Sequence, residues 1–300
     1  MAKSVGTDTI LGEREAELRA TEQSLFERLH AALERFGADL TANDAEHLRE
    51  ATAQLAELFL IVIAGEFNSG KSSFINALVG ERILPEGVTP TTDRINILRF
   101  GEQPDSKLLE DFLLLRTYPA PILGELNIVD TPGTNAIIRR HEELTRRFVP
   151  RSDLVLFITS ADRPFTESER TFLEHIREWG KKIVLVINKI DILEAKQRDE
   201  VMNFVRTNAA TLLGVEPTVF PVSARNALKA READDADAWQ ASGFAAIEDY
   251  LLKTLDEGER VRLKLLNPLG VGLKLASTYR TAADERLKTL SDDIRTIDNM

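Results

Sequence analysis

The residues with the clearest chemical meaning lie around position 70. The segment Gly65-Glu66-Phe67-Asn68-Ser69-Gly70-Lys71-Ser72 has the spacing G-x-x-x-x-G-K-[ST] and follows the apolar run 58–64. Glycines let backbone amides converge on phosphates, lysine neutralises the β- and γ-phosphates, and the serine hydroxyl can hold Mg²⁺. A helix predicted to start near Lys71 adds a favourable dipole. We expect a nucleotide to be bound by Gly65, Asn68, Ser69, Gly70, Lys71, Ser72 and Ser73.

A second loop that could sense phosphate begins at Asp130. The sequence DTPG at 130–133 follows the apolar run 126–129. An aspartate at the carboxyl end of a strand can hold Mg²⁺ through water, and the Gly133 amide can approach a γ-phosphate. By itself this sequence also suits a simple turn, so the prediction depends on its place after the phosphate loop.

A third group of residues predicts selectivity for guanine. NKID at 188–191 ends the apolar run 183–188. The Asp191 carboxylate can accept hydrogen bonds from guanine N1 and N2, two donors that adenine lacks. Ser223 and Ala224 can close the pocket with a backbone amide directed at guanine O6. We therefore expect GTP and GDP as ligands, with base contacts from Asn188, Lys189, Asp191, Ser223 and Ala224.

A threonine that closes over Mg²⁺ and the γ-phosphate is expected between the phosphate loop and the next strand. Thr92 is favoured because it lies nearest the run 95–100, and Thr91 is the alternative. The expected reaction is in-line attack of water on the γ-phosphate, with Lys71, Thr92 and Gly133 stabilising the developing charge. The expected ligands of Mg²⁺ are Ser72, Thr92 and Asp130.

The elements that must position these residues follow from the apolar pattern. Short apolar runs alternate with helical stretches, which predicts an α/β domain with a mostly parallel sheet flanked by helices. The expected strands are 58–64, 95–100, 126–129, 154–159, 183–188 and 218–222, and the expected helices lie near 71–79, 166–179 and 196–213. The charged stretch 226–242 is interpreted as a surface insertion or exposed helix. The GTPase domain is assigned to 58–256.

Helical segments are predicted on both sides of this domain, at 1–57 and 257–300. The first carries an apolar stripe and a second helix capped by Asn43 or Asp44. The last carries a stripe that needs partner helices: Leu269, Leu273, Ala276, Ala283, Leu287, Leu290, Ile294 and Ile297. Together these segments predict a helical neck or bundle. Because the stripe continues almost to Met300, we expect the chain to be part of a longer protein.

Residues 267–272 contain one proline and two glycines between the domain and the last stripe. Proline is expected to end a helix here, and glycine permits unusual backbone angles. Either a hinge or a fixed turn between two helices would account for the segment.

Composition limits the partners. The 300 residues carry a net charge of −11 and no cysteine. Acidic chains are repelled by nucleic acid, so no nucleic-acid partner is expected, and the absence of thiols fits a reducing compartment. The longest apolar run is far shorter than the ~20 residues that span a bilayer, and no secretory signal is recognisable. We expect a cytoplasmic protein.

These motifs, in this order, resemble those of the dynamin superfamily, in particular the bacterial dynamin-like proteins that are similar to mitofusins and the plastid Fzo-like protein. The resemblance spans about 45–300, and its GTPase motifs are the specific part. It is carried by GEFNSGKSSFINAL at 65–78, ILPEGVTPTT at 83–92, DTPG at 130–133, SADRPFTESE at 160–169, NKID at 188–191 and VSAR at 222–225. It implies a homodimer formed through GTPase domains, a role in membrane fusion, fission or maintenance, and peripheral membrane association through a lipid-binding region absent from this chain.

Two positions depart from that resemblance. Dynamins have a catalytic glutamine where this chain has Phe67, and Thr134 follows DTPG where Ras-like proteins have a water-orienting glutamine. Neither side chain can position a water. The resemblance implies that backbone carbonyls of the closing loop, or a charge from the partner, fill this role. Arg82, Arg94 and Arg163 are possible sources of that charge, although each also suits an ordinary surface position.

Two other function classes stay open. The same motifs serve switch GTPases that act on ribosomes or tRNA, against which the acidic charge argues. A GTP-binding scaffold that does not hydrolyse the nucleotide is also consistent with Phe67 and Thr134.

Overall fold

One sheet organises the part of the chain that the structure describes. The computed structural model describes residues 13–36, 41–54, 58–86, 94–131, 147–254 and 257–298. Within them, eight strands follow the spatial order β3-β4-β2-β5-β1-β6-β7-β8. The strands are β1 (Phe59–Ala64), β2 (Ile95–Phe100), β3 (Asp105–Glu110), β4 (Leu113–Tyr118), β5 (Leu126–Asp130), β6 (Leu154–Ser160), β7 (Ile183–Asn188) and β8 (Thr218–Pro221).

The centre of the sheet is parallel, as predicted. Strand β1 pairs in parallel with β5 and β6, and β7 pairs in parallel with β6 and β8. All six residues of β1 are buried, with alternate side chains entering two different apolar cores. A strand buried on both faces reads as a continuous apolar run, which explains why β1 is recognisable in the sequence.

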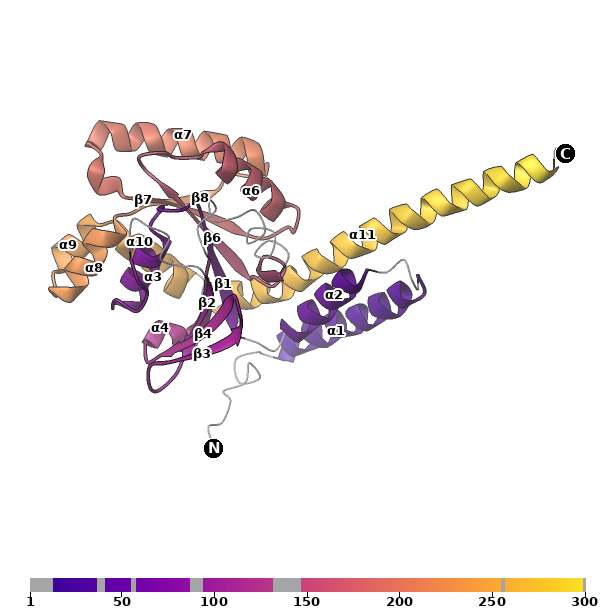
Figure 1. Ribbon diagram of the computed structural model, residues 1–300, viewed down its shortest axis with the longest axis horizontal. Helices are drawn as coiled ribbons and strands as arrows, with labels where there is room; N and C mark the ends of the chain where they lie inside the picture. Colours follow the sequence, from indigo (N-terminus) through magenta and orange to yellow (C-terminus); the bar gives the residue numbers. More distant parts are fainter. Residues whose placement is uncertain are drawn as a thin grey trace.

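Helices cover both faces of the sheet (Figure 1). Helices α3 (Lys71–Val79), α4 (Pro121–Glu125), α8 (Ala224–Glu232) and α10 (Phe244–Asp249) contribute to one core, and α6 (Glu167–Arg177) and α7 (Ala195–Leu213) to the other. The short elements α9 (Ala236–Ala241), η4 (Ile190–Ile192) and η5 (Tyr250–Thr254) also belong to this part of the chain. This architecture confirms the predicted fold class.

The helical segments at the two ends of the sequence lie side by side. Helices α1 (Glu13–Glu34) and α2 (Ala42–Gln54) run along α11 (Glu257–Asp298), as Figure 1 shows. Their contact buries Phe26, Leu33 and Val271, and Tyr279 Oη donates a hydrogen bond to Asp44 Oδ2 at 2.8 Å. The predicted bundle of N- and C-terminal helices is therefore present.

Two expectations about this bundle are wrong. The cap of α2 is Thr41, whose Oγ1 accepts a hydrogen bond from the Asp44 amide at 3.1 Å, so neither Asn43 nor Asp44 takes that role. Helix α11 also continues through Pro268, so the proline does not end a helix, and neither a hinge nor a turn separates two helices there. Tertiary contacts override the local preference of proline.

Those contacts centre on the buried carboxylate of Asp153. It accepts hydrogen bonds from the Leu60 amide at 2.8 Å and from Lys264 Nζ at 2.8 Å, and Asn267 Nδ2 lies 3.3 Å from its Oδ1. Asn267 Nδ2 also donates to the Asp153 carbonyl at 2.8 Å. Because Lys264 and Asn267 lie just before Pro268, this polar joint holds α11 against the amino ends of the strands.

The two glycines of α11 serve close packing. Neither has a left-handed backbone. A Cβ at Gly270 would lie 3.2 Å from the Trp179 carbonyl oxygen, and one at Gly272 would contact Phe26 and Leu29 at 3.5 Å. The glycines thus allow α11 to approach the domain on one side and α1 on the other.

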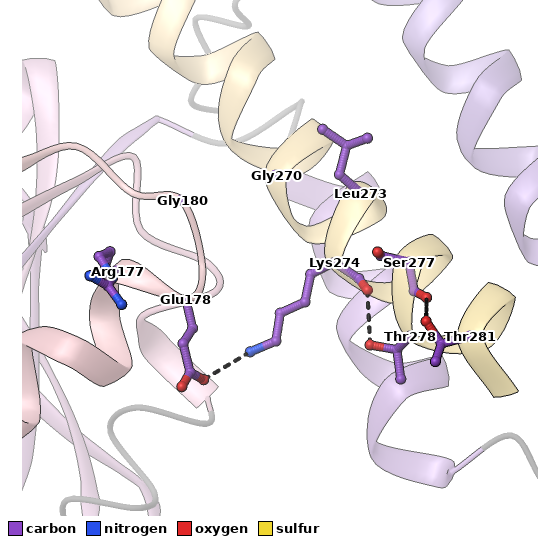
Figure 2. Close-up of a pocket in the computed structure, with 9 residues that line it drawn as sticks. All are labelled: Arg177, Glu178, Gly180, Gly270, Leu273, Lys274, Ser277, Thr278 and Thr281. Atoms are coloured by element: carbon purple, nitrogen blue, oxygen red, sulfur yellow. Dashed lines mark hydrogen bonds and ion pairs between the residues drawn. The ribbon is translucent and has the colours of Figure 1, made fainter. Parts of the chain in front are cut away.

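A cleft of about 560 Å³ lies where α11 leaves the domain (Figure 2). Lys274 Nζ lies 3.6 Å from a carboxylate oxygen of Glu178 and 3.7 Å from the centroid of the Trp179 ring. Beyond this point the predicted stripe is exposed, with Leu287, Leu290, Ile294 and Ile297 showing between 58% and 70% of their surface. No helix of the described segments covers it.

Two expectations about the sheet domain also need correction. Strands β3 and β4 were not predicted. The residues of β3 are exposed or half-buried and leave no apolar run, whereas β4 begins with the apolar run Leu113–Leu115, which was overlooked. The stretch 226–242 is partly a structural helix, since α8 buries Ala227, Leu228 and Ala230.

The buried carboxyl of Glu22 on α1 predicts a pH-dependent stability. Only 4% of the residue is exposed, and burial raises its pKa to about 8. The folded state therefore keeps a proton that the unfolded state releases above about pH 4.3, so stability falls as pH rises toward 8. Glu22→Gln should melt about 3 °C or more above the wild type at pH 8.5 and close to it at pH 5. Thermal unfolding measured at both pH values checks this.

The exposed Glu17 on the same helix provides the control. Glu17→Gln should shift the melting temperature equally at both pH values. Parallel pH profiles for wild type and Glu22→Gln would contradict the prediction.

Candidate nucleotide-binding site

The candidate site starts at the tight turn between β1 and α3. Gly65 and Gly70 have φ angles of 148° and 89°. A Cβ on Gly65 would lie 2.0 Å from the Ile158 carbonyl oxygen, and one on Gly70 would lie 2.2 Å from Asn188 Nδ2. Asn68 also adopts a left-handed backbone, with φ 61°, which asparagine tolerates better than most residues. Only glycine fits at the two ends of this turn.

The ammonium of Lys71 folds back over the turn. Lys71 Nζ donates to the carbonyl oxygens of Gly65 at 2.9 Å and Glu66 at 2.8 Å. Burial lowers the pKa of Lys71 to about 8, although the negative charges of Asp130, Glu169 and Glu66 act in the other direction and raise it. The Ser69 hydroxyl is buried and has no hydrogen-bond partner among the described residues. A buried cation beside the amino end of α3 makes this turn suitable for phosphate.

Asp130 lies at the end of β5, beside the last residues of β1. It is 1% exposed, and its Oδ1 has no hydrogen-bond partner in the described part of the chain. Its Oδ2 lies 3.5 Å from Asn96 Nδ2. Burial raises the pKa of Asp130 to about 6, although the positive charge of Lys71 acts to lower it. Asp130 thus offers an unpaired buried carboxylate oxygen, and Ser72, in the first turn of α3, offers a half-buried hydroxyl. Both are oxygen ligands of the kind that a divalent cation takes.

The remaining predicted residues of the phosphate side fall into two groups. Ser73 is half-buried, and its Oγ donates to Glu86 Oε2 at 2.7 Å. Thr91, Thr92, Gly133 and Thr134 lie outside the described residues, so their predicted roles stay predictions.

Asn188 connects the phosphate turn with the predicted guanine segments. Its Nδ2 donates to the Ser69 carbonyl at 2.9 Å, and its Oδ1 accepts from the amides of Lys189 at 2.8 Å and Ala224 at 3.0 Å. A backbone amide of Ser223 or Ala224 was expected to point at guanine O6, but the Ala224 amide donates to Asn188 and the Ser223 amide donates to the Ser242 carbonyl oxygen at 2.8 Å. One side chain brings three predicted segments into a single site.

Asp191 follows a left-handed residue, Lys189, whose φ is 64°. Its Oδ1 accepts from Ser223 Oγ and its Oδ2 from Arg225 Nη2, both at 2.6 Å. Burial alone would raise the pKa of Asp191, but the hydrogen bonds from Ser223 and the backbone and the charge of Arg225 hold the pKa below its ordinary value. A carboxylate that stays ionised is the state that can accept two guanine donors.

Sequence reasoning missed several supporting residues. Arg198 on α7 donates from Nε to the carbonyl oxygens of Ile190 at 3.1 Å and Leu193 at 3.2 Å, so it supports the turn that carries Asp191. Thr166 Oγ1 donates to Glu66 Oε1 at 2.7 Å and ties the phosphate turn to α6. The T-x-x-E capping box at Thr166 is readable from sequence, whereas no local signal marks Arg198.

The candidate arginines have different surroundings. Arg82 Nε forms an ion pair with Glu232 Oε1 at 2.9 Å. Arg163 is exposed, and Arg94 and Phe67 are half-buried. None of these placements tests whether a charge is supplied across a dimer.

A P-loop GTPase domain is the class that the fold and site define. A protein-family model described as 50S ribosome-binding GTPase matches residues 60–189. The chain is 40% identical to the probable transmembrane GTPase FZO-like, chloroplastic, of Arabidopsis thaliana, over 84% of this chain and 30% of that protein. It is 24% identical to the bacterial dynamin-like protein of Nostoc punctiforme, over 98% of this chain and 52% of that protein.

A solved structure of an oligomerised bacterial dynamin pair shares the fold. It covers 94% of this chain with a TM-score of 0.61 at 20% identity, and this chain covers 50% of it. This likeness supports the fold, and the relatives confirm the resemblance to dynamin-like and FZO-like GTPases that the motifs predicted. The chain spans only 30% and 52% of the length of the plant and Nostoc relatives.

The contacts of Arg198 predict that it strengthens guanine binding indirectly. Arg198→Ala should weaken binding of a fluorescent GDP analogue by about two- to tenfold, because two hydrogen bonds to the turn are lost. Arg206→Ala, at an exposed position two turns further along α7, is the matched control and should bind like the wild type. Equal affinity for both variants would contradict the role given to Arg198.

Proposed function

We propose that this chain binds GTP and GDP with Mg²⁺ and hydrolyses GTP between two paired GTPase domains, in the service of membrane remodelling. The observation that carries the nucleotide part is the presence of two buried charges at the carboxyl ends of β1 and β5, which are neighbouring strands. The Lys71 ammonium is held by backbone carbonyl oxygens, and Oδ1 of Asp130 has no hydrogen-bond partner among the described residues. A triphosphate and its cation would satisfy both groups at once.

The chemistry is in-line attack of water on the γ-phosphate. Lys71 would leave the carbonyl oxygens of Gly65 and Glu66 and neutralise charge on the β- and γ-phosphates, while the Gly133 amide and the loop of Thr92 close on the γ-phosphate. When bound, Mg²⁺ would supply positive charge that stabilises the charge developing on the phosphate oxygens. Ser72, Asp130 and Thr92, with Thr91 as the alternative, are the residues that would hold it.

Domain pairing is proposed because the third residue of the phosphate turn does not have a side-chain amide, such as that of glutamine, that could orient a water. Phe67 occupies that position and is half-buried, so it can exclude water but not orient it. A homodimer in which a backbone carbonyl or a charge from the second domain fills this role would make hydrolysis depend on protein concentration.

The membrane role is supported by the names of the dynamin-like relatives. The plant relative is named a transmembrane GTPase, and the structural neighbour is described as sensing and tethering membranes. In the described residues, none of the helices combines the length and apolarity needed to cross a bilayer. We propose cytoplasmic placement with peripheral membrane contact through a region outside this chain.

A second candidate is a switch GTPase that acts on the ribosome or tRNA. The description of the matching family model favours it, and the net charge of −11 opposes it. A salt-sensitive shift of tRNA or ribosomal RNA on native gels would support this candidate over the membrane role.

Phosphate release measured at increasing protein concentration tests the proposed function. The specific rate with GTP should rise with concentration, and Lys71→Ala should abolish release by removing the phosphate-binding cation. Arg99→Ala, at an exposed position of β2, should match the wild type. A specific rate that stays constant with protein concentration would argue against pairing of GTPase domains. If the wild type released phosphate no faster than Lys71→Ala, the chain would be a GTP-binding scaffold and not a GTPase.

A further inference from the structure

The carboxylate expected to read guanine already has two side-chain donors. Ser223 Oγ bonds one oxygen of Asp191 and Arg225 Nη2 bonds the other, each at 2.6 Å. The Asp191 side chain is 14% exposed, whereas that of Arg225 is 67% exposed. The arginine therefore lies on the solvent side of the carboxylate, where an incoming base must approach.

The two donors differ in how easily they can leave. Ser223 is short, and its hydroxyl also accepts a hydrogen bond from the Asn226 amide at 3.3 Å as the cap of α8. Arg225 is long and its side chain is largely exposed, so water can solvate its guanidinium when it leaves the carboxylate. Ser223 can keep its place when a ligand binds, while Arg225 can swing into solvent at little cost.

The chemistry of the guanidinium matches that of the expected ligand. Guanine presents N1–H and N2–H as parallel donors on one edge, and a guanidinium presents its N–H groups in the same fork-like manner. In the structure one of these N–H groups, on Arg225 Nη2, donates to Asp191 Oδ2, an oxygen that a guanine N–H would also use. Adenine has no such pair, so it could not replace the lost contact.

We propose that Arg225 is an internal competitor for guanine, which occupies Asp191 in the nucleotide-free protein and must leave before the base is read. The inference rests on the proposed guanine binding at Asp191. As a consequence, guanine nucleotides bind more slowly and less tightly than they would without Arg225. An adenine nucleotide would break the ion pair between Arg225 and Asp191 without forming hydrogen bonds that replace it.

Two variants distinguish competition between Arg225 and guanine from the opposite effect, in which the aliphatic part of the Arg225 side chain covers the base and strengthens binding. Arg225→Met keeps an unbranched stem and removes the guanidinium, while Arg225→Lys keeps a positive charge without the fork. Arg99→Met removes an exposed arginine from β2 and is the matched control. Association and dissociation of a fluorescent GDP analogue would be followed by stopped flow at several salt concentrations.

Arg225→Met should associate faster and bind about two- to fivefold more tightly, the change that corresponds to releasing an exposed ion pair. Arg225→Lys should lie between it and the wild type, and Arg99→Met should match the wild type. The advantage of Arg225→Met should shrink as salt rises, because salt weakens the ion pair in the wild type. A purely structural role would not produce that salt dependence.

Slower or weaker binding by Arg225→Met, or binding equal to that of the wild type, would overturn the competitor role while leaving GDP binding itself intact. A wild type that does not bind the GDP analogue would instead overturn the proposed function. Melting temperatures of the variants identify any loss of folding, in which case Arg225→Lys alone decides the outcome.

Discussion

The hydrogen bonds of Asn188 are the constraint on which the site depends. Its amide bonds the phosphate turn at Ser69 and accepts from the backbone of Lys189 and Ala224. The same side chain fills the space that a Cβ on Gly70 would need, so the glycine and the asparagine require one another. Because three loops meet on one buried amide, the phosphate and base regions have a fixed spacing before any ligand arrives.

A second polar centre lies at the opposite end of the same strands. Asp153 bonds the backbone of Leu60 near the start of β1, and Lys264 and Asn267 bond Asp153 from α11. Burial lowers the pKa of the neighbouring Lys181 to about 7, against the opposing charge of Asp153. Strand β1 thus runs from the polar joint that fixes α11 to the turn that carries Lys71, so α11 and the phosphate site are attached to the same strand.

Much of this architecture follows from sequence because its signals are local. Strands buried on both faces, such as β1 and β7, appear as continuous apolar runs, and the glycine-lysine turn is fixed by sterics. The exposed strand β3 leaves no such run, and the continuous helix through Pro268 depends on contacts with Asp153, far away in sequence. The roles of Arg198 and Arg225 were missed for the same reason, since each depends on a fold that brings distant residues together.

The central claim is that Asp191 reads the amine at C2 of guanine in a site fixed by Asn188. Calorimetric titration with GTP and with inosine triphosphate, which differs only by lacking that amine, tests it most directly. The wild type should bind GTP about tenfold or more tightly, the difference expected for one hydrogen bond to a charged group. Equal affinities for the two nucleotides would contradict the account.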